Sequence, residues 1–335
     1  MKPVSLLTIL LTALITTFSC KDGITTIEEP QPGRRDYVWK RDTLRADMEG
    51  WQHLHGIWGD SPKDIWVIGD AYTYVNKVWH YDGVNWKNYL LNEYAEPTKI
   101  WGVSSSEIWM LTKQSEIWKY NGTKWYKHTT IVPPGYSHIL FQDIFGYTNS
   151  IYAVGVAVKS DGDYTGIIVH YNGVKWEIVK TPLIKEYFFN VIFVNGGDVL
   201  ISGQDFHEPN QSCRLYVLKN GTLNLIGKNR FTYFLGVLNK KCYISVDAKV
   251  YEYVNGVLVE HLTLPKSIYA GGIIGRSLKD FFCANSGWYL GHYNGTSLDN
   301  LYFVNASIAN GFVFEKEVFF ILNNQGSTIL HGKLN

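Results

Sequence analysis

The sequence contains few cysteines, and their scarcity limits what can hold the fold together. It has 4 cysteines in 335 residues, and only Cys213, Cys242 and Cys283 lie beyond the first twenty positions. Three thiols form at most one disulfide within a chain, and their spacing matches no metal knuckle. We therefore expect buried apolar thiols and a fold that does not depend on disulfides.

The chain also lacks an excess of either charge, with 31 Lys and Arg against 30 Asp and Glu. A dedicated nucleic-acid-binding protein would show a basic excess, so we expect no nucleic-acid partner. There is no nucleophile elbow, no glycine-rich phosphate loop and no pair of zinc ligands. The sequence therefore indicates no catalytic residue, and we assign neither a metal nor a cofactor.

Long apolar runs are missing after the first twenty residues. The single run, "VSLLTILLTALITTF" (4–18), follows Lys2. Its length is typical of a signal-peptide core and short for a membrane-spanning helix. Ser19 and Cys20 come next and resemble the lipobox of bacterial lipoproteins, in which the equivalent Cys is acylated (palmitate) and becomes the first mature residue. The alternative is an ordinary cleaved signal in which Cys20 has no role.

The chain therefore divides into three parts. Residues 1–19 are expected to be a lipoprotein signal peptide, and 20–36 a lipidated Cys followed by a flexible tether rich in Pro, Gly and charge. Residues 37–335 form the folded domain, which we expect to be soluble and monomeric. Its membrane contact would be the lipid, which places it in the cell envelope, anchored to the outer membrane on the surface or the periplasmic face.

What the sequence does contain is one aromatic-rich phrase written several times. It reads "KVWHYDGVNWK" (77–87), "EIWKYNGTKWYK" (116–127) and "IIVHYNGVKWEI" (167–178). Its glycine recurs at Gly83, Gly122, Gly173, Gly221, Gly256 and Gly295, with a decayed seventh copy at Gly332 in "ILHGKLN". A second phrase, such as "HGIWGDSPKDIWVIG" (55–69), precedes each copy. These phrases define seven units of roughly forty residues.

Each unit carries two turn signals between short β-prone runs. An Asp-Gly or Asn-Gly pair flanked by alternating aromatic and aliphatic residues is a strong hairpin signal. The unit then reads as four strands, for example "GIWG", "DIWVIG", "VWHYDG" and "NWKNY". Seven such units predict an all-β fold, a seven-bladed β-propeller with four-stranded blades.

The two ends of the domain fit the same prediction. The last unit stops before an outer strand, whereas "YVWKRDTL" (37–44) resembles an outer strand with no unit before it. We therefore expect the N-terminal strand to complete the last blade and close the ring, which hides two sheet edges.

The phrasing "IWG…DIWVIG…HYDG…W" over residues 37–335 resembles bacterial lipoproteins with Trp-rich, seven-bladed propellers. It is distantly similar to Kelch-type blades, without their regular Gly-Gly doublet, and it lacks the WD dipeptide of WD40 repeats. The resemblance implies an architecture. It implies no activity, because one fold hosts many functions.

Residues that recur at one blade position are expected to be architectural. Most Trp residues do so and should pack blade against blade. His80, His170 and His292 share another such position. Asn-Gly-Thr at Asn121, Asn220 and Asn294 matches a glycosylation pattern but is better interpreted as turn residues. Trp51 and Trp288 fall outside the repeat.

Strand direction places the variable loops on one face. Loops from second to third strands, and from an outer strand to the next inner strand, emerge together there, and binding residues concentrate on such loops. Aromatic rings beside carboxylates suit a carbohydrate. The candidate ligand-binding residues are Trp51, His53, Tyr72, Tyr74, Asp161, Asp163, Tyr164, Asp205, His207, Glu208 and Trp288.

Two of these groups have metal-like spacing. Asp161 and Asp163 have a spacing that could coordinate calcium, but the further ligand positions of an EF-hand loop do not follow them. His53 and His55 alternate on one strand without a third ligand, and a hydrogen-bonded channel histidine is the simpler interpretation. We therefore expect no metal at either place.

Three functions remain open. The leading hypothesis is a non-enzymatic binding lipoprotein that holds a glycan or an envelope protein on the variable-loop face. One alternative is a glycan-active hydrolase or lyase, which needs two carboxylates or a His–Tyr–Arg group at the channel mouth. The other is a scaffold for an envelope protein complex, which needs a large exposed apolar patch.

Overall fold

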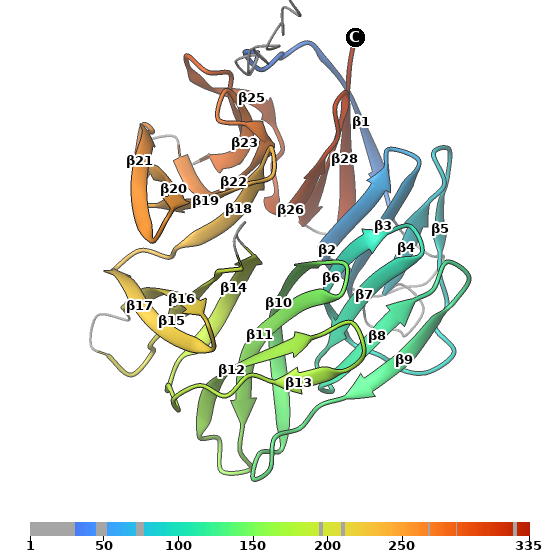
Figure 1. Ribbon diagram of the computed structural model, residues 1–335. Helices are drawn as coiled ribbons and strands as arrows, with labels where there is room; N and C mark the ends of the chain where they lie inside the picture. Colours follow the sequence, from blue (N-terminus) through green and yellow to red (C-terminus); the bar gives the residue numbers. More distant parts are fainter. Residues whose placement is uncertain are drawn as a thin grey trace, which may run out of the picture. The chain divides into compact units, whose positions relative to one another are not determined.

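The computed structural model describes residues 31–44, 52–71, 77–193, 197–208, 212–266, 269–285, 287–323 and 327–335. These residues form 28 strands in seven four-stranded antiparallel sheets (Figure 1). The predicted all-β class with seven four-stranded blades is confirmed. No helix in the described part of the chain could cross a membrane. The expected signal peptide, Cys20 and most of the tether lie outside the described residues.

The strands follow the repeat, with the inner strand of each blade first. Blade 1 is β2 (Gln52–Ser61), β3 (Asp64–Ala71), β4 (Val78–Tyr81) and β5 (Trp86–Asn88); blade 2 is β6 (Pro97–Ser104), β7 (Glu107–Thr112), β8 (Glu116–Tyr120) and β9 (Trp125–Thr130). Blade 3 is β10 (His138–Tyr147), β11 (Ser150–Val158), β12 (Tyr164–Tyr171) and β13 (Trp176–Ile178); blade 4 is β14 (Tyr187–Phe193), β15 (Val199–Gln204), β16 (Cys213–Lys219) and β17 (Thr222–Asn229).

The remaining blades continue in order. Blade 5 is β18 (Phe234–Leu238), β19 (Lys241–Val246), β20 (Lys249–Val254) and β21 (Val257–Thr263); blade 6 is β22 (Tyr269–Ser277), β23 (Asp280–Asn285), β24 (Tyr289–Tyr293) and β25 (Leu298–Phe303). Blade 7 is β26 (Ser307–Val313), β27 (Glu317–Asn323), β28 (Ser327–Leu334) and β1 (Tyr37–Thr43). Each inner strand contacts the inner strands of both neighbouring blades, and β26 contacts β2, so the blades form a ring around a channel.

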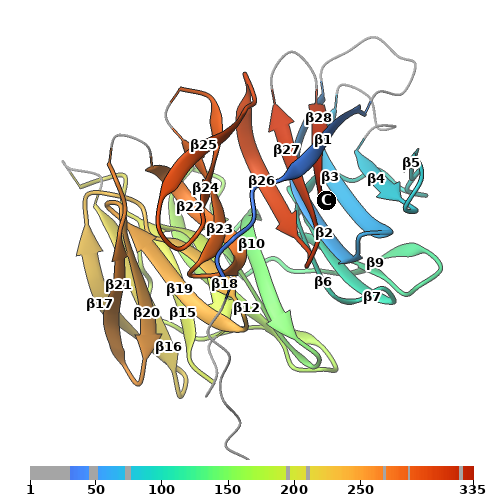
Figure 2. The same ribbon diagram turned by 90° about the horizontal axis from the view of Figure 1, so that it is seen from above.

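Strand β1 closes the ring, as predicted. It pairs antiparallel with β28 from Tyr37 opposite Leu334 to Thr43 opposite Thr328, and Figure 2 shows the two strands together. The prediction for Gly332 was wrong in detail. It is not a turn glycine but lies inside β28 opposite Trp39. A Cβ atom there would stand 2.5 Å from the Trp39 ring, so glycine makes room for the closing tryptophan.

Tryptophans pack blade against blade, as their repetition indicated. The ring of Trp66 on β3 is fully buried and lies 4.8 Å from Tyr120 and 5.5 Å from Trp125 of blade 2. Trp109 of blade 2 meets Trp176 of blade 3 in the same way, at 5.4 Å between centroids. The repeated phrase therefore builds a hairpin and also covers the aromatic residue of the preceding blade.

The Asx-Gly pairs form the hairpin turns between third and outer strands. Gly83 has φ +91°, and the Asp82 carboxylate accepts hydrogen bonds from the backbone N–H groups of Val84 and Asn85. Asn121 and Asn294 accept the same bonds in blades 2 and 6. In these blades the side-chain oxygen of the Asn therefore organises a turn, as expected.

The repeated histidine joins the second and third strands of a blade. His80 stacks on Trp66 with 4.3 Å between centroids, and its Nε2 lies 2.7 Å from Oδ1 of Asp64. The equivalent residues in blades 3, 6 and 7 are His170, His292 and His331, whose polar partners are Ser150, Asp280 and Glu317. The architectural interpretation of these histidines is confirmed, and His331 extends it.

The three described cysteines are buried free thiols. Burial raises the pKa of Cys242 and of Cys283 to about 12. They behave as small apolar core residues, as expected.

Candidate binding site on the loop face

Most of the described residues predicted to bind a ligand lie where second strands connect to third strands, on the face here called the loop face. Tyr164 begins β12 in blade 3, and His207 follows β15 in blade 4. The structure brings these two together. The Tyr164 hydroxyl lies 3.0 Å from Nδ1 of His207, and the rings stack with 5.3 Å between centroids.

Three further aromatic residues extend this pair into a cluster. Tyr187 lies 4.6 Å from Tyr164 and 5.2 Å from Phe206 between ring centroids, and Phe189 lies 6.0 Å from Phe206. Phe206 is 44% exposed, and the His207 side chain is 66% exposed. We call Tyr164, Tyr187, Phe189, Phe206 and His207 the aromatic surface. It joins two blades and leaves apolar ring area open to solvent.

A buried charge network lies beside the aromatic surface. The carboxylate of Glu186 is 1% exposed and accepts hydrogen bonds from the Arg214 guanidinium and, at 2.7 Å, from the Tyr216 hydroxyl. Arg214 also donates to Glu208, and its Nη1 lies 3.4 Å from Oδ2 of Asp205. One planar guanidinium therefore bridges three carboxylates, a geometry that suits Arg and not Lys.

The network fixes the loop that carries Phe206 and His207. Asp205 accepts a 2.8 Å hydrogen bond from the backbone N–H of His207, and Glu208 pairs with Lys228 at 3.0 Å. The Ser212 hydroxyl and Lys228 hold the pKa of Glu208 below its usual value. Burial and the neighbouring Glu186 raise the pKa of Tyr216, which keeps its hydroxyl protonated as a donor.

The two aspartates with calcium-like spacing have other partners. The Asp163 carboxylate pairs with Lys159 and Lys185, each at 2.9 Å, and these ammonium groups lower its pKa. Asp161 accepts the backbone N–H of Asp163 at 3.0 Å, which is a turn contact. No group of three or more His, Cys, Asp and Glu residues in the described ranges is arranged to hold a metal ion.

Other predicted residues are not brought to the aromatic surface. His53 lies on β2 in blade 1, 6.1 Å from the ring of His55. Nε2 of His55 lies 2.9 Å from the carbonyl oxygen of Pro97, and burial lowers its pKa, so the neutral ring donates to that carbonyl. Trp288 is 58% exposed in a turn of blade 6, with φ +67°. The predicted residues Trp51, Tyr72 and Tyr74 lie outside the described residues.

Comparison with known proteins supports the architecture. No protein-family model matches the chain, and no curated protein matches it. The solved structure of YCF48 bound to D1 peptide is similar, with TM-score 0.60, 14% identity, and coverage of 91% of this chain and 100% of that chain. Virginiamycin B lyase from Staphylococcus aureus gives TM-score 0.62 and 12% identity, covering 89% of this chain and 100% of that chain. YCF48 from Cyanidioschyzon merolae gives TM-score 0.58 and 14% identity, covering 88% of this chain and 98% of that chain.

The fold is a seven-bladed β-propeller. At these identities the likeness shows the fold alone. The propeller's loop face also carries binding candidates that the sequence interpretation missed: Glu186, Tyr187, Phe189, Phe206 and Arg214. One available signal was "KEYFFN" (185–190), an aromatic stretch at the start of an inner strand, next to a loop that had to emerge on this face. Another was Arg214, a charge inside an otherwise apolar third strand.

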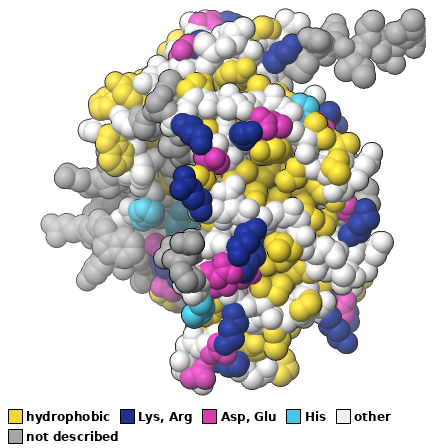
Figure 3. Space-filling model, turned by 90° about the vertical axis from the view of Figure 1, so that its left-hand side faces the viewer, with side chains coloured by type: hydrophobic (Ala, Val, Ile, Leu, Met, Phe, Trp, Pro, Cys, Tyr) yellow, Lys and Arg dark blue, Asp and Glu magenta, His cyan; other side chains and the backbone are white. Residues whose placement is uncertain are grey.

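The channel and the outer rim bear on the two alternative functions. Among the described residues that line two cavities in the channel of the propeller, Asp143 is the one carboxylate. On the rim, Leu225 of β17 and Val257 and Val259 of β21 are exposed. Figure 3 shows hydrophobic side chains on this side of the molecule interspersed with charged ones.

Proposed function

We propose that this protein is a membrane-anchored, non-enzymatic binding lipoprotein of the bacterial envelope that holds its ligand at the aromatic surface of the loop face. The observation that carries the proposal is a group of partly exposed rings, contributed by two blades, beside a buried charge network. A scaffold that keeps exposed aromatic side chains in fixed positions lowers the entropic cost of binding. Exposed aromatic residues of this kind are typical binding hot spots.

A protein ligand fits the ring geometry best. The planes of Tyr187 and Phe206 meet at 82°, and those of Tyr164 and Tyr187 at 61°. These rings therefore present edges and faces at different angles instead of one flat platform for a sugar ring. Such an uneven aromatic surface suits the apolar side chains of a polypeptide. The comparison with YCF48, which was solved with a D1 peptide, supports the same class of ligand.

A glycan is the second candidate, on a separate observation. Tyr164, His207 and the salt-bridged Asp163 place hydroxyl, imidazole and carboxylate groups around the same rings. Hydroxyl-rich ligands use such groups beside aromatic faces. A glycan array and a pull-down from solubilised envelope, run with the same protein preparations, separate the two classes.

The decisive variant is Phe206→Ala, with Phe303→Ala as its matched control. Phe303 is 51% exposed on blade 6, so both changes remove a partly exposed phenyl ring. We expect Phe206→Ala to weaken binding of the purified partner at least about 10-fold, as at other aromatic hot spots, with an unchanged melting temperature. Phe303→Ala should bind normally. Equal affinities for both variants and the wild type would remove the aromatic surface from the proposal.

The lipid anchor is tested separately at Cys20. Wild-type protein expressed with an alkyne analogue of palmitate should carry the label and sediment with membranes, whereas Cys20→Ser should carry no label and remain in the soluble fraction. Equal membrane association of the two proteins would contradict acylation at Cys20, and it would leave the ligand-binding proposal to be judged on Phe206.

A further inference from the structure

The channel of the propeller contains two connected cavities. Their volumes are about 350 and 370 Å³, and both are lined by Lys99, Asn190 and Asn310. This is the size range of small-molecule sites in proteins. The shared lining residues make them adjacent parts of one space between the inner strands. The smaller, here called the upper cavity, also reaches Phe282 and Cys283 of β23, and the larger is the lower cavity.

One residue from each blade faces this space at the same level of the ring. By strand register these are Gly56, Lys99, Asp143, Asn190, Phe234, Gly272 and Asn310. All of them line the cavities. Lys99 is the one cation at this level among the described residues.

The polar groups at this level are satisfied by protein partners, except for Lys99. Asp143 accepts the backbone N–H of Val191 at 3.0 Å. Asn190 accepts from Ser202 at 3.2 Å, and Asn310 accepts from the N–H of Gly311 at 2.8 Å. The half-buried Lys99 ammonium makes no hydrogen bond and no ion pair with any described residue.

Asp143 faces the same space, but it makes no ion pair with Lys99 among the described contacts. Burial raises the pKa of its carboxyl group, and the nearby charge of Lys99 acts in the opposite direction. An ammonium group in a narrow space without a hydrogen-bonded partner favours the binding of an anion there.

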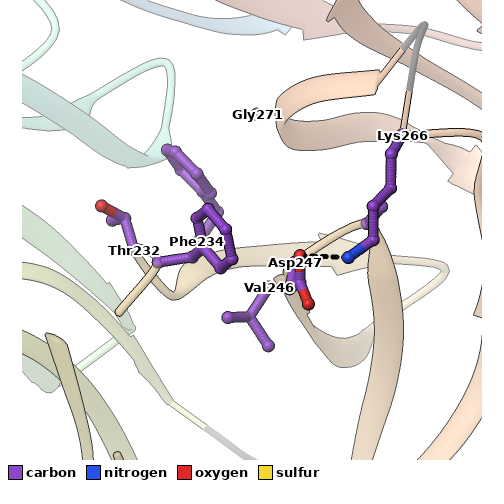
Figure 4. Close-up of a pocket in the computed structure, with 8 residues that line it drawn as sticks. Thr232, Phe234, Val246, Asp247, Lys266 and Gly271 are labelled. Atoms are coloured by element: carbon purple, nitrogen blue, oxygen red, sulfur yellow. Dashed lines mark hydrogen bonds and ion pairs between the residues drawn. The ribbon is translucent and has the colours of Figure 1, made fainter. Parts of the chain in front are cut away.

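An apolar pocket opens beside this space on the loop face. It has a volume of about 330 Å³ and is lined by Phe231, Phe234, Val246, Ala248 and Gly271, with neighbouring polar residues. Figure 4 shows the Phe234 ring in this pocket and the Lys266 side chain, which reaches Asp247 at 2.7 Å. Lys266 is thus already paired. Phe234 and Gly271 also line the upper channel cavity, so the pocket adjoins the channel.

We propose that the channel mouth binds an organic carboxylate: its anionic group meets the Lys99 ammonium, and its apolar substituent occupies the pocket of Phe231 and Phe234. Two sources share this chemistry, a free small aromatic or aliphatic acid and the C-terminal carboxylate of a peptide that ends in an apolar residue. The site is separate from the aromatic surface and does not depend on it.

The test uses the full-length Cys20→Ser protein and four probes. These are 3-phenylpropionate, 3-phenylpropan-1-ol, the peptide Gly-Gly-Phe with a free carboxylate, and its C-terminal amide. Trp101 lines the lower cavity, so quenching of tryptophan fluorescence reports binding alongside calorimetry. We expect at least one acid to bind, and its neutral analogue to bind at least about 10-fold more weakly, because a charge-assisted contact is lost. Binding of the free acid alone identifies a small-molecule site, and binding of the peptide acid identifies a C-terminus.

Variants locate the contact. Lys99→Met should weaken binding of the acid about 10- to 100-fold, Lys99→Arg should restore most of it, and Phe234→Ala should weaken it several-fold. The matched control is Lys185→Met, which removes an exposed lysine of the same face and should change nothing. Phe206→Ala should also bind the acid normally, so failure of this site and failure of the aromatic surface are distinguishable. The proposal is overturned if neither acid binds, or if Lys99→Met binds as tightly as the wild type.

Discussion

Replacing Arg214 tests how strongly the charge network supports the loop face. Arg214→Met keeps a long apolar side chain and removes the guanidinium. The Glu186 carboxylate, 1% exposed, would then have the Tyr216 hydroxyl at 2.7 Å as its remaining donor. Removing one partner of a buried ion pair costs about 3–5 kcal/mol, because the other charge is left without compensation. We expect a loss of this size in the free energy of unfolding at pH 7.

An exposed pair provides the matched control. Lys159 pairs with Asp163 at 2.9 Å, but the two side chains are 40% and 34% exposed, and Asp163 keeps Lys185 as a second partner. Solvent screens such a pair, so Lys159→Met should leave the free energy of unfolding close to that of the wild type. The contrast between the two variants isolates the effect of burial from the effect of charge.

The assay is urea unfolding followed by tryptophan fluorescence, with the free energy extrapolated to water. A second substitution identifies the mechanism. Glu186→Gln removes the stranded charge and keeps an oxygen for the Tyr216 hydroxyl, so the double variant should be more stable than Arg214→Met alone. The reasoning is refuted if Arg214→Met lies within about 1 kcal/mol of the wild type, or if Glu186→Gln recovers nothing in its background.

Two further predictions follow from buried titratable groups. Burial raises the pKa of Asp143 in the folded state, so the stability that this proton provides is complete below the unfolded-state pKa and is lost as pH rises through the folded-state pKa. Asp143→Asn should therefore raise the free energy of unfolding at pH 7 and leave it unchanged at pH 3; the same gain at both pH values would contradict this origin. Because burial raises the pKa of Cys242 and Cys283 to about 12, a thiol reagent at pH 8 should label neither in the folded protein and both in guanidinium. Rapid labelling of the native protein would contradict their burial.

The architecture could be predicted because its signals are local. An Asx-Gly pair indicates where a hairpin turns, and the recurrence of His80 at the same position in several blades indicates an architectural role. The closing strand was predictable from a unit without an outer strand at one end and a strand without a unit at the other. Gly332 was misplaced because the decayed last copy of the repeat still contains a glycine, the residue typical of the turn. The pairing of β28 with β1 places that glycine inside the strand instead.

The candidate site was predictable only in part, because its contacts join residues that are distant in sequence. The loop face followed from strand direction, and it brought Tyr164 and His207 together across 43 positions. The pairing of Glu186 with Arg214 depends on how the loop between blades 3 and 4 lies against β16, the third strand of blade 4. No periodicity of the sequence reveals that arrangement. Trp288 was chosen because it is an aromatic residue outside the repeat. It lies in a turn of blade 6 and does not join the aromatic surface.

The pairing of β1 with β28 also has a consequence for biosynthesis. Arg34 donates a hydrogen bond to the backbone carbonyl of Asn335, 301 positions away, so this contact cannot form until residue 335 has left the ribosome. Until then β1 has no partner strand, and pairings of such long range form slowly. A product of stalled translation that ends before Ser327 would keep β1 as an open edge, exposed to aggregation and to proteases. Completion of the ring thus distinguishes finished molecules from interrupted ones during quality control.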